Sequence, residues 1–378
     1  MQIARMLKLL ILFVFIISFQ RCTKKKSSRC DAKTGVLGGL FLYLNSCERG
    51  PSSQTDQLKK PFASTSIWNR LIPADAVYSD VSDAVSGDSA AFPAAVGPDI
   101  VAICYTDPAA PAVKVEKNIG WDYPGRGMSS GQVQYTRQLS ASSCAGLSMV
   151  KNGNGLFAIV DMKTGSADQG VGGWRCNGGS ILHLLPDSTK AHISNVITGD
   201  GLQGYGRGSS LPSLGGVILQ GEISSGINHA VAVTLPQTRF SKTKNYVWPA
   251  SSADSIASNP DYGYQGPNTS YTMGTLLAIP KNTDISSLGL STPQARQLAS
   301  AAQNYGWYIA DASGYAKGKI PSVQFAMEAW AAKNDLGFTV DYSTEKNSID
   351  KSKLDDSLFT ADIQKILKNL KAVTSNTQ

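Results

Sequence analysis

The sequence lacks the short motifs that mark the most common metal and nucleotide sites. It contains no HExxH pair, no GxxxxGKS or GxxxxGKT phosphate loop and no DxDxDG calcium loop. Histidine is scarce, because the chain has only His183, His192 and His229. Cys176 lies close to the first two of these, but the spacing fits no standard zinc module. We therefore expect no metal site and no cofactor.

Long runs of Glu, Lys, Leu and Ala are also missing. Charged residues make up 17% of the 378 residues, Gly numbers 36, and Ser and Thr are abundant. This balance favours strands and turns over helices. No repeat of fixed period is present. The composition therefore predicts a mostly β protein.

The positive charge of the chain is concentrated at its N-terminus. The formal net charge is +7, and seven basic residues precede the first acid, Asp31, so 7 − 7 leaves the remainder near zero. These seven residues are Arg5, Lys8, Arg21, Lys24, Lys25, Lys26 and Arg29. A basic groove for phosphates is therefore not indicated, and we expect no nucleic-acid partner.

The N-terminus has the three parts of a secretory signal. A cationic start is followed by an apolar run over residues 9–19 and then by Cys22. The run is too short to span a bilayer comfortably, so export is favoured over a permanent transmembrane helix. The segment resembles a bacterial lipoprotein signal with Cys22 as the acylated cysteine, although Gln20 and Arg21 stand where small residues are usual. Simple cleavage and an uncleaved anchor are the alternatives to acylation at Cys22.

The remaining cysteines predict two disulfides. If Cys22 carries lipid, five cysteines are left, and an odd number cannot all pair within the chain. Cys30 and Cys47 bracket an apolar stretch, which is typical of a small loop closed by a disulfide. This segment also resembles the membrane-proximal part of some spirochaetal lipoproteins. Of the other three we expect Cys104 and Cys144 to pair, and the alternative for each is a small buried hydrophobe.

Composition divides the chain into four parts. Residues 1–22 form the signal or lipoprotein-like segment, 23–60 a polar tether, 61–342 a β-rich globular domain, and 343–378 a charged linker with a C-terminal helix. Within the domain, short runs such as DIVAICYT, LFAIVDM and NHAVAVTL are separated by Gly, Pro, Asn and Asp. Strands at this spacing, without long helices between them, predict a β-sandwich or a jelly roll.

Two helices are predicted within this mostly β chain. The internal helix begins with Thr292 as its N-cap and Pro293 at its first position, and it ends at Gly306. The C-terminal helix covers about residues 360–373, where Ile and Leu residues form an apolar stripe opposite the lysines. We expect the second helix to pack on the outside of the domain, with binding of a partner as the alternative.

Several spaced motifs resemble a family of secreted bacterial and fungal proteins that is mainly uncharacterised. PFASTSIWNRLIPADA is similar to the opening S-x-W-N-x-x-I-P pattern of that family. GYGRGSSLPSLGGVILQGEISSGINHAVAVTLP is similar to its central RGSGLP-x-LGG block, which continues into EI-x-x-G-x-I-x-HAL. The similarity extends through YVWPASSAD and MGTLLAIP and covers roughly residues 61–330, apart from an insert near residues 140–154. The resemblance implies a β-sandwich of carbohydrate-active type.

Cleavage of a polysaccharide needs one of two sets of side chains. Hydrolysis uses two carboxyl groups that flank the sugar bond. Elimination uses a base near the sugar C5, often Tyr or His, together with an Arg, amide or metal that neutralises the uronate. Either set would line a groove on one face of a sheet.

Glu222 and His229 are the first candidates for catalysis. Glu222 follows a predicted strand and precedes a predicted turn, where it would act on a sugar, cap the turn or pair with Arg207. His229 lies in a predicted strand on the same face as Ile227 and Val231, where a hydrogen-bonded core histidine is the alternative to a catalyst. Their spacing of seven residues establishes no contact between them.

Arg207 and Asp161 are candidates in loops. Arg207 stands in the glycine-rich stretch GYGRGSSLP, where the backbone can approach a ligand and the guanidinium can bind a carboxylate with two hydrogen bonds. A structural pair with Asp200 or Glu222 explains Arg207 almost as well. Asp161 ends a buried strand just before a turn, so it is either a catalytic acid or the source of the turn's hydrogen bonds.

Asp311 offers the best pairing of carboxyl groups. By alternation it shares a strand face with Trp307, which we expect to contact the substrate. If this strand forms a hairpin with SVQFAMEA, Gln324 or the substrate-binding candidate Glu328 lies near Asp311. A polar cluster on an edge strand is the alternative. Further aromatic residues that could stack on sugars are Trp68, Trp121, Trp174, Trp248, Tyr123, Tyr262 and Tyr264.

The sequence as a whole predicts an exported, lipid-anchored protein of the outer membrane or cell surface that binds or cleaves a polysaccharide. Cleavage by a glycoside hydrolase or polysaccharide lyase mechanism requires Glu222, His229, Arg207, Asp161 and Asp311 to converge in one cleft. The alternative is a non-catalytic adhesin or envelope-structural lipoprotein, whose partner is a host or envelope surface component. If these side chains are dispersed or buried in separate pairs, the catalytic interpretation of this set is to be dropped.

Overall fold

The computed structural model describes residues 58–86, 95–120, 127–141, 143–144, 154–175, 179–184, 191–313, 322–341 and 346–375. The signal segment and nearly all of the tether lie outside these ranges. So do the residues Cys22, Cys30, Cys47, Cys176, Trp121 and Tyr123, for which predictions were made. Within the described ranges, no helix has the length and apolar character needed to cross a bilayer.

The described strands form one large sheet and two small sheets. The large sheet has the strand order β1-β15-β10-β11-β9-β12-β2-β5-β6-β8. Its strands are β1 Tyr78–Asp80, β2 Ala95–Tyr105, β5 Leu156–Asp161, β6 Ser166–Gly170, β8 Ala191–Ile193, β9 Val231–Pro236, β10 Leu276–Ala278, β11 Trp307–Ser313, β12 Ser322–Glu328 and β15 Lys371–Val373. The small sheets have the orders β4-β3-β7 and β13-β14. Their strands are β3 Ala112–Asn118, β4 Ser129–Gln138, β7 Ile181–Leu184, β13 Phe338–Asp341 and β14 Lys346–Ile349.

Helices occupy a smaller part of the described chain. They are α3 Ser82–Ser86, α4 Glu222–Ser225, α5 Pro293–Asn304, α6 Ala329–Leu336 and α7 Asp356–Asn369, with the 3-10 turns η2 Gln237–Arg239 and η3 Ile285–Leu288. In α5 the side chain of Thr292 accepts a hydrogen bond from the backbone N–H of Ala295, and Pro293 is the first helical residue. The predicted internal helix and C-terminal helix are therefore confirmed.

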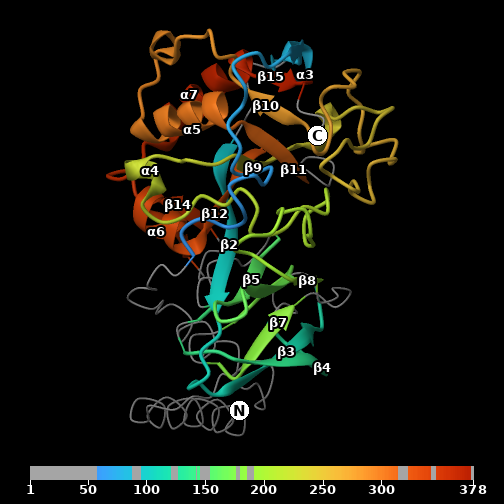
Figure 1. Cartoon of the computed structure of the whole chain (residues 1–378), viewed down its shortest axis with the longest axis vertical. Coiled ribbons are helices and arrows are strands. Elements are labelled where there is room, and N and C mark those ends of the chain that lie inside the picture. Colours follow the sequence, from blue (N-terminus) through green and yellow to red (C-terminus); the bar gives the residue numbers. More distant parts are fainter. Residues whose placement is uncertain are drawn as a thin grey trace, which may run out of the picture.

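Strand β2 joins the two halves of the large sheet. Its first part, from Ala95 to Val101, pairs in parallel with β12, and its last part, from Val101 to Tyr105, pairs in parallel with β5. Figure 1 shows β2 running from the upper, helix-rich half of the molecule to the lower half, which holds β3, β4 and β7. A single eleven-residue strand thus fixes the two halves relative to each other.

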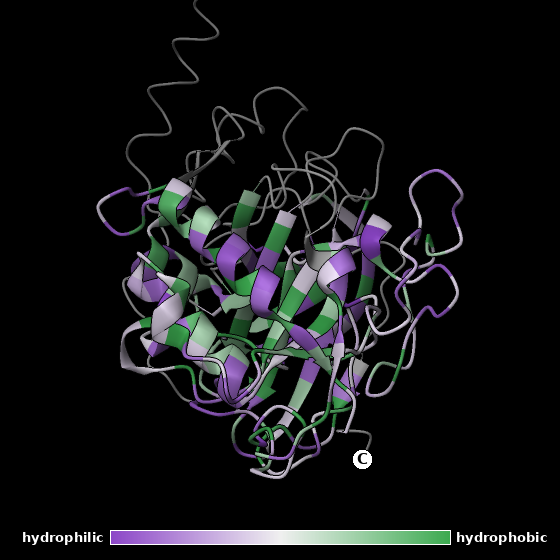
Figure 2. Cartoon of the chain, turned by 90° about the horizontal axis from the view of Figure 1, so that it is seen from above, coloured by the Kyte–Doolittle hydropathy of each residue, from purple (hydrophilic) through white to green (hydrophobic). Residues whose placement is uncertain are grey.

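One face of the large sheet is covered by helices. The apolar residues of α5, α6 and α7 pack with Val231, Val233, Trp307 and Phe325 of the sheet in one buried cluster. Burial on both faces explains why β9 and β11 read as continuous buried runs instead of alternating ones. In Figure 2 many of the hydrophobic residues lie on the strands in the interior of this half.

The opposite face of the large sheet is covered by irregular chain. Residues of the 58–72 and 211–219 segments pack there with Ala232, Tyr308 and Ala326 in a second buried cluster. Glycine is required at position 216, which has φ of 65°, because a Cβ would lie 2.4 Å from the backbone nitrogen of Ala232 and 2.6 Å from the indole of Trp68. The GG dipeptide of the central sequence block therefore lets Trp68 pack against the backbone.

The lower half contains a disulfide and a third buried cluster. Cys104 on β2 is bonded to Cys144, as the sequence predicted. Around this bond pack Val113 and Val115 of β3, Phe157 of β5 and other apolar side chains. The disulfide thus ties β2 to the segment that follows β4.

The structure confirms a mostly β protein but changes several details. Parallel pairs lie beside antiparallel pairs in the large sheet, and the strand order does not confirm a sandwich or jelly roll. The stretch GGVILQ, predicted as a strand, contributes only an isolated bridge from Ile218 to Met327. Residues 343–378 were predicted as a linker and an outer helix, yet they supply β15, which lies between β1 and β10, and α7, whose apolar side chains are in the main core.

Candidate functional site

Glu222 and His229 contact each other, although their spacing gave no reason to expect it. Glu222 begins the short helix α4, and His229 lies in the loop before β9 instead of inside the strand. The ring Nε2 of His229 is 3.0 Å from Glu222 Oε2, and its Nδ1 is 2.8 Å from the carbonyl oxygen of Ala230. Both ring nitrogens therefore face oxygen atoms of the protein itself.

This geometry favours the protonated imidazole. A carbonyl and a carboxylate can only accept hydrogen bonds, so the two contacts are both satisfied when both nitrogens carry a proton. Burial alone would lower the pKa of His229, but the hydrogen bond to Glu222, the charge of Glu222 and the Ala230 carbonyl together raise it. His229 therefore acts as a buried clamp and has no ring nitrogen left for a substrate, which corrects its prediction as a catalyst.

The turn beside this pair is held by three acidic side chains. Glu222 Oε2 accepts a hydrogen bond from the backbone N–H of Leu219 at 2.7 Å. Glu328 accepts from the N–H of Gln220, and Asp335 accepts from that of Gly221. Glu328 thus holds the backbone of this turn. It was predicted to bind substrate near Asp311, and it lies elsewhere.

Arg207 pairs with Asp99, a residue that the sequence reasoning missed. Its Nη1 lies 3.7 Å from Asp99 Oδ2, and its Nη2 donates to the carbonyl of Ser213 at 3.2 Å. Both charged side chains are buried. Burial raises the pKa of Asp99, while the charge of Arg207 opposes the rise. The predicted pair of Arg207 with Asp200 or Glu222 is therefore wrong, since Asp99 takes that place.

Asp311 lies near this pair, but the predicted hairpin is wrong. Strand β9 lies between β11 and β12, so that Asp311 and Gln324 both pair with Thr234 of β9. Glu328 is four residues further along β12. The carboxylate of Asp311 accepts hydrogen bonds from the backbone of Gly208 and Ala312 and from the amide of Asn154. Asp311 is therefore a buried anchor for the loop that carries Arg207.

A second missed carboxyl group, that of Asp254, faces the same loop. A Cβ on Gly208 would lie 2.6 Å from both of its carboxylate oxygens, so the carboxyl group packs directly against the backbone of Gly208. The hydroxyl of Tyr264 donates to Asp254 at 3.2 Å. Burial, with the nearby charges of Asp254 and Asp99, raises the pKa of Asp311 well above its ordinary value. Asp254 lies in YVWPASSAD, so its place in a family-like block was the signal that could have identified it.

The predicted residues therefore form two separate groups. His229 precedes Thr234 by five residues, which at about 3.3 Å per residue separates the Glu222 pair from the Arg207 group by about 16 Å. Asp161 accepts a hydrogen bond from the N–H of Lys163 and forms a turn at the end of β5. Trp307 is fully buried, and its indole donates to the carbonyl of Leu298. The side chains are paired or buried apart, so the catalytic interpretation of this set is dropped.

The string GMSSG at residues 127–131 has the spacing of a nucleophile elbow, which the sequence reasoning also missed. Such an elbow places the serine on a sharp turn between a strand and a helix. Ser129 instead begins strand β4, and its hydroxyl donates to the carboxylate of Glu116 on the neighbouring strand. The string therefore does not form a nucleophile elbow.

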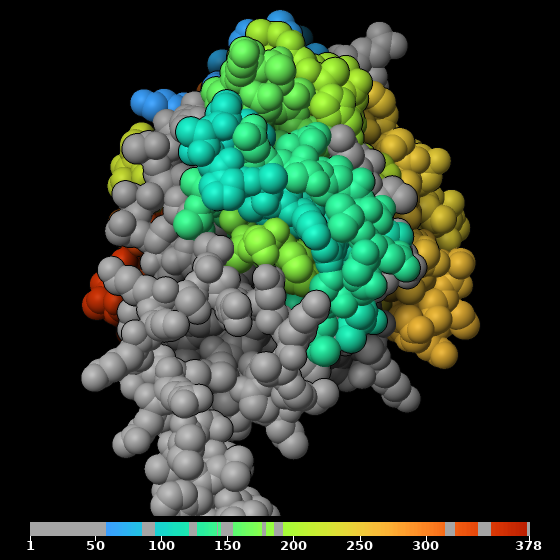
Figure 3. Space-filling view, turned by 90° about the horizontal axis from the view of Figure 1, so that it is seen from below, coloured from blue at the N-terminus to red at the C-terminus, as the bar shows by residue number. Residues whose placement is uncertain are grey.

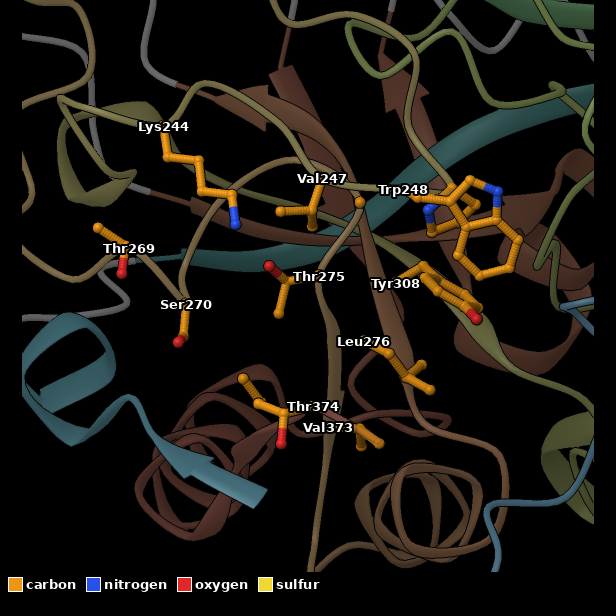
Figure 4. Close-up of a pocket in the computed structure, with 13 residues that line it drawn as sticks. Lys244, Val247, Trp248, Thr269, Ser270, Thr275, Leu276, Tyr308, Val373 and Thr374 are labelled. Carbon is orange, nitrogen blue, oxygen red and sulfur yellow. The ribbon is translucent and has the colours of Figure 1, made fainter. Parts of the chain in front are cut away.

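A pocket of about 280 Å³ lies on the large sheet near β15, β10 and β11. Figure 4 shows the indole of Trp248 beside the ring of Tyr308 on one side of it, with Lys244 on another side. The remaining lining residues are Val247, Pro249, Thr269, Ser270, Gly274, Thr275, Leu276, Ala372, Val373 and Thr374. Trp248 is 46% exposed, whereas the other tryptophans of the described ranges are buried. The pocket thus combines an exposed aromatic face with several hydroxyl groups.

Comparisons with known proteins identify no relative of this chain. No family model, no curated protein and no solved structure matches it.

Proposed function

We propose that the protein is exported and binds a polysaccharide in the pocket beside Trp248. The observation that carries this proposal is the exposed indole at the edge of a pocket that is lined with hydroxyl groups. Large aromatic residues are normally buried, so a half-exposed tryptophan in a concave site is typical of a ligand contact. Its flat apolar face fits the C–H face of a sugar ring, and the contact requires no charge on the sugar.

The other pocket residues suit the remaining surface of a sugar. The hydroxyl groups of Thr269 and Thr275 can each donate one hydrogen bond to a sugar. Those of Ser270 and Thr374 already donate within the protein, so they can accept hydrogen bonds from a sugar. In Figure 4 the ammonium group of Lys244 points toward this part of the pocket and adds a donor. A hydrophobic wall opposite a few polar groups is the usual composition of a small-molecule site.

The tryptophan is tested by removing its side chain. Full-length Trp248→Ala protein should bind a responsive polysaccharide about 30-fold more weakly, because truncation of a central aromatic contact costs about 2 kcal/mol. Calorimetric titration against a panel of neutral and acidic polysaccharides measures this difference. Tyr246→Ala is the matched control, since Tyr246 is equally exposed at 46% and does not line the pocket. Equal loss in both variants would reject the pocket as the binding site.

The alternative function is a non-catalytic adhesin or an envelope-structural lipoprotein whose partner is a host or envelope surface component. It is favoured if no polysaccharide of the panel binds the wild-type protein. The sandwich or jelly-roll prediction belongs with the carbohydrate proposal, because the family resemblance implies both, although strand spacing also favours such a fold. Neither is needed for the adhesin alternative.

Attachment through Cys22 is a separate part of the proposal. The apolar run over residues 9–19 and the cysteine that follows it support lipidation. Labelled palmitate should enter the wild-type protein during expression in bacteria and should be absent from Cys22→Ser. Equal labelling of the two proteins would contradict the anchor and leave the sugar-binding proposal intact.

A further inference from the structure

A second cluster of functional groups lies in the lower half of the molecule. Asp168 of β6 meets His192 of β8 and Arg137 of β4, so the cluster joins the end of the large sheet to a strand of the small sheet. Figure 3 views this end of the molecule, where the cyan and green surface belongs to the segments that include β3 and β4. In the sequence His192 was notable only for its closeness to Cys176, as a metal-site pattern that fits no zinc module. The other members of the cluster, Asp168 and Arg137, are remote in sequence, so no local pattern predicts the cluster.

The histidine of this cluster is held in one orientation. Its Nδ1 lies 3.1 Å from Asp168 Oδ1. A carboxylate only accepts hydrogen bonds, so Nδ1 carries the proton and, in the neutral ring, Nε2 keeps its lone pair. The side chain of His192 is 52% exposed and that of Asp168 is 3% exposed. A buried carboxylate that orients an exposed imidazole is the arrangement by which proteins prepare a general base.

Within the described part of the chain, no residue contacts the Nε2 atom of His192, which leaves it open to an incoming molecule. The contact with Asp168 accounts for the interactions of His192 within the described residues. This distinguishes His192 from His229, whose two ring nitrogens both face protein oxygens.

Arg137 places a positive charge beside this base. Its Nη2 forms an ion pair with the other oxygen of Asp168, and 31% of its side chain is exposed. Its guanidinium carbon lies 5.1 Å from the centre of the Tyr135 ring, which supports the side chain from below. A planar guanidinium has five N–H donors, so the group can hold Asp168 and still donate to a second carboxylate.

We propose that this cluster is a lyase site that cleaves polysaccharides containing uronic acids by β-elimination. Nε2 of His192 removes the proton from C5 of the uronate. The electron pair of that C–H bond forms the C4=C5 double bond, while the C4–O4 bond breaks and its electrons leave with the oxygen. The leaving oxygen takes a proton from water, and His192 returns its proton to solvent. No oxidant or reductant is consumed.

A histidine base can take part in several reactions, and the positive charge of Arg137 favours β-elimination among them. Removal of the C5 proton places negative charge on the neighbouring carboxylate, and a cation at that carboxylate stabilises the charge as it develops. Hydrolysis of a neutral sugar bond would use a pair of carboxyl groups instead. Asp168 is a positioning residue, because it touches His192 and Arg137 and is too buried to touch the polymer.

The lyase site is distinct from the Trp248 pocket. The pocket lies on β15, β10 and β11, and the cluster lies on β6 and β8 at the other end of the strand order. Five strand spacings of about 4.8 Å separate β11 from β6, which is about 24 Å. The proposed cleavage therefore does not rest on sugar binding in the pocket.

The test uses full-length protein incubated with polygalacturonate, alginate and hyaluronan, with the ultraviolet absorbance of the unsaturated uronate as the readout. The wild type should form this product from at least one polymer. His192→Gln should lower kcat/KM at least about 100-fold, because it removes the general base and keeps a hydrogen bond to Asp168 possible. Lys114→Gln is the matched control, since it removes an exposed positive charge from β3, the strand paired with β4, and it should retain the wild-type rate.

Asp168→Asn tests the positioning role. An amide can donate to Nδ1, which would move the ring proton to Nε2 and remove the base. The variant should lose activity, and nitrogen NMR should show its neutral His192 ring protonated at Nε2, while Lys114→Gln should keep the wild-type rate and the proton at Nδ1. Thermal unfolding verifies that each variant is folded.

Two kinds of result, one from activity and one from NMR, would overturn the lyase site. One is the absence of unsaturated product from all three polymers with the folded wild-type protein, or wild-type activity in His192→Gln. The other needs no substrate: nitrogen NMR of the wild type should show the neutral His192 ring protonated at Nδ1, and protonation at Nε2 contradicts the proposed base.

Discussion

At the scale of single residues, the histidines differ in what their ring nitrogens contact. His229 is enclosed between Glu222 and the carbonyl of Ala230, whereas His192 is held at one nitrogen only. His229 lies in the central GGVILQGEISSGINHAV block, whereas the sequence around His192 matches no motif. The sequence therefore predicted His229, and not His192, as a catalytic candidate. Contacts across the fold, which no local pattern contains, decide which of the two can reach a substrate.

The His229 clamp predicts a pH-dependent stability. The pKa of His229 is raised in the folded protein, so its contribution is fully present below the unfolded pKa of about 6.5 and is lost as the pH rises through the folded pKa. At pH 6 the His229→Gln variant should be less stable by about 2 kcal/mol, the usual size for a hydrogen bond to a charged group. Urea unfolding of both proteins at pH 6 and pH 9 measures the difference.

The same experiment contains its own control. Glu222→Gln should abolish the loss of stability with rising pH while the ring remains in place, because burial, the largest influence on His229, lowers its pKa once the charge of Glu222 is gone. A difference between wild type and His229→Gln that stays constant from pH 6 to pH 9 would contradict the protonated clamp.

At the scale of helices and strands, the sequence predicts the elements better than their partners. Thr292 and Pro293 mark the start of α5 because capping is a local interaction. The pairing of Asp311 with Thr234 joins strands that are far apart in the chain, and this is why the predicted hairpin of β11 and β12 is wrong. Every residue of β9 is buried, so its sequence lacks the alternation of polar and apolar residues from which the two faces of a strand are assigned.

The placement of α7 and β15 predicts the effect of a truncation. Removal of residues 343–378 takes Phe359, Ile363, Ile366, Leu367 and Leu370 from the core. At about 2 kcal/mol for each buried side chain, the loss is roughly 10 kcal/mol, which is comparable to the whole stability of a typical domain. The shortened protein should therefore show no cooperative thermal unfolding by circular dichroism. A cooperative transition near that of the full chain would contradict the packing of α7.

At the scale of the whole molecule, the excess positive charge and the candidate binding groups lie in different parts of the chain. The seven basic residues that account for the net charge lie before Asp31, outside the described ranges, so the positive net charge gives no reason to expect a polyanion groove on the folded part. The large sheet instead separates a pocket with an exposed tryptophan from a cluster with an exposed histidine. Sequence patterns suggested carbohydrate chemistry, and the strand order was needed to place these candidate groups.

The central claim is that a sugar covers the indole of Trp248, and oxidation with N-bromosuccinimide tests it most directly. Trp248 is 46% exposed, while Trp68, Trp174, Trp307 and Trp330 are buried, so it should react first among the described tryptophans. Mass spectrometry of peptides measures its oxidation with and without a polysaccharide that binds. Saturating polysaccharide should protect Trp248 from oxidation. Equal oxidation of Trp248 in the presence and absence of bound polysaccharide would contradict it.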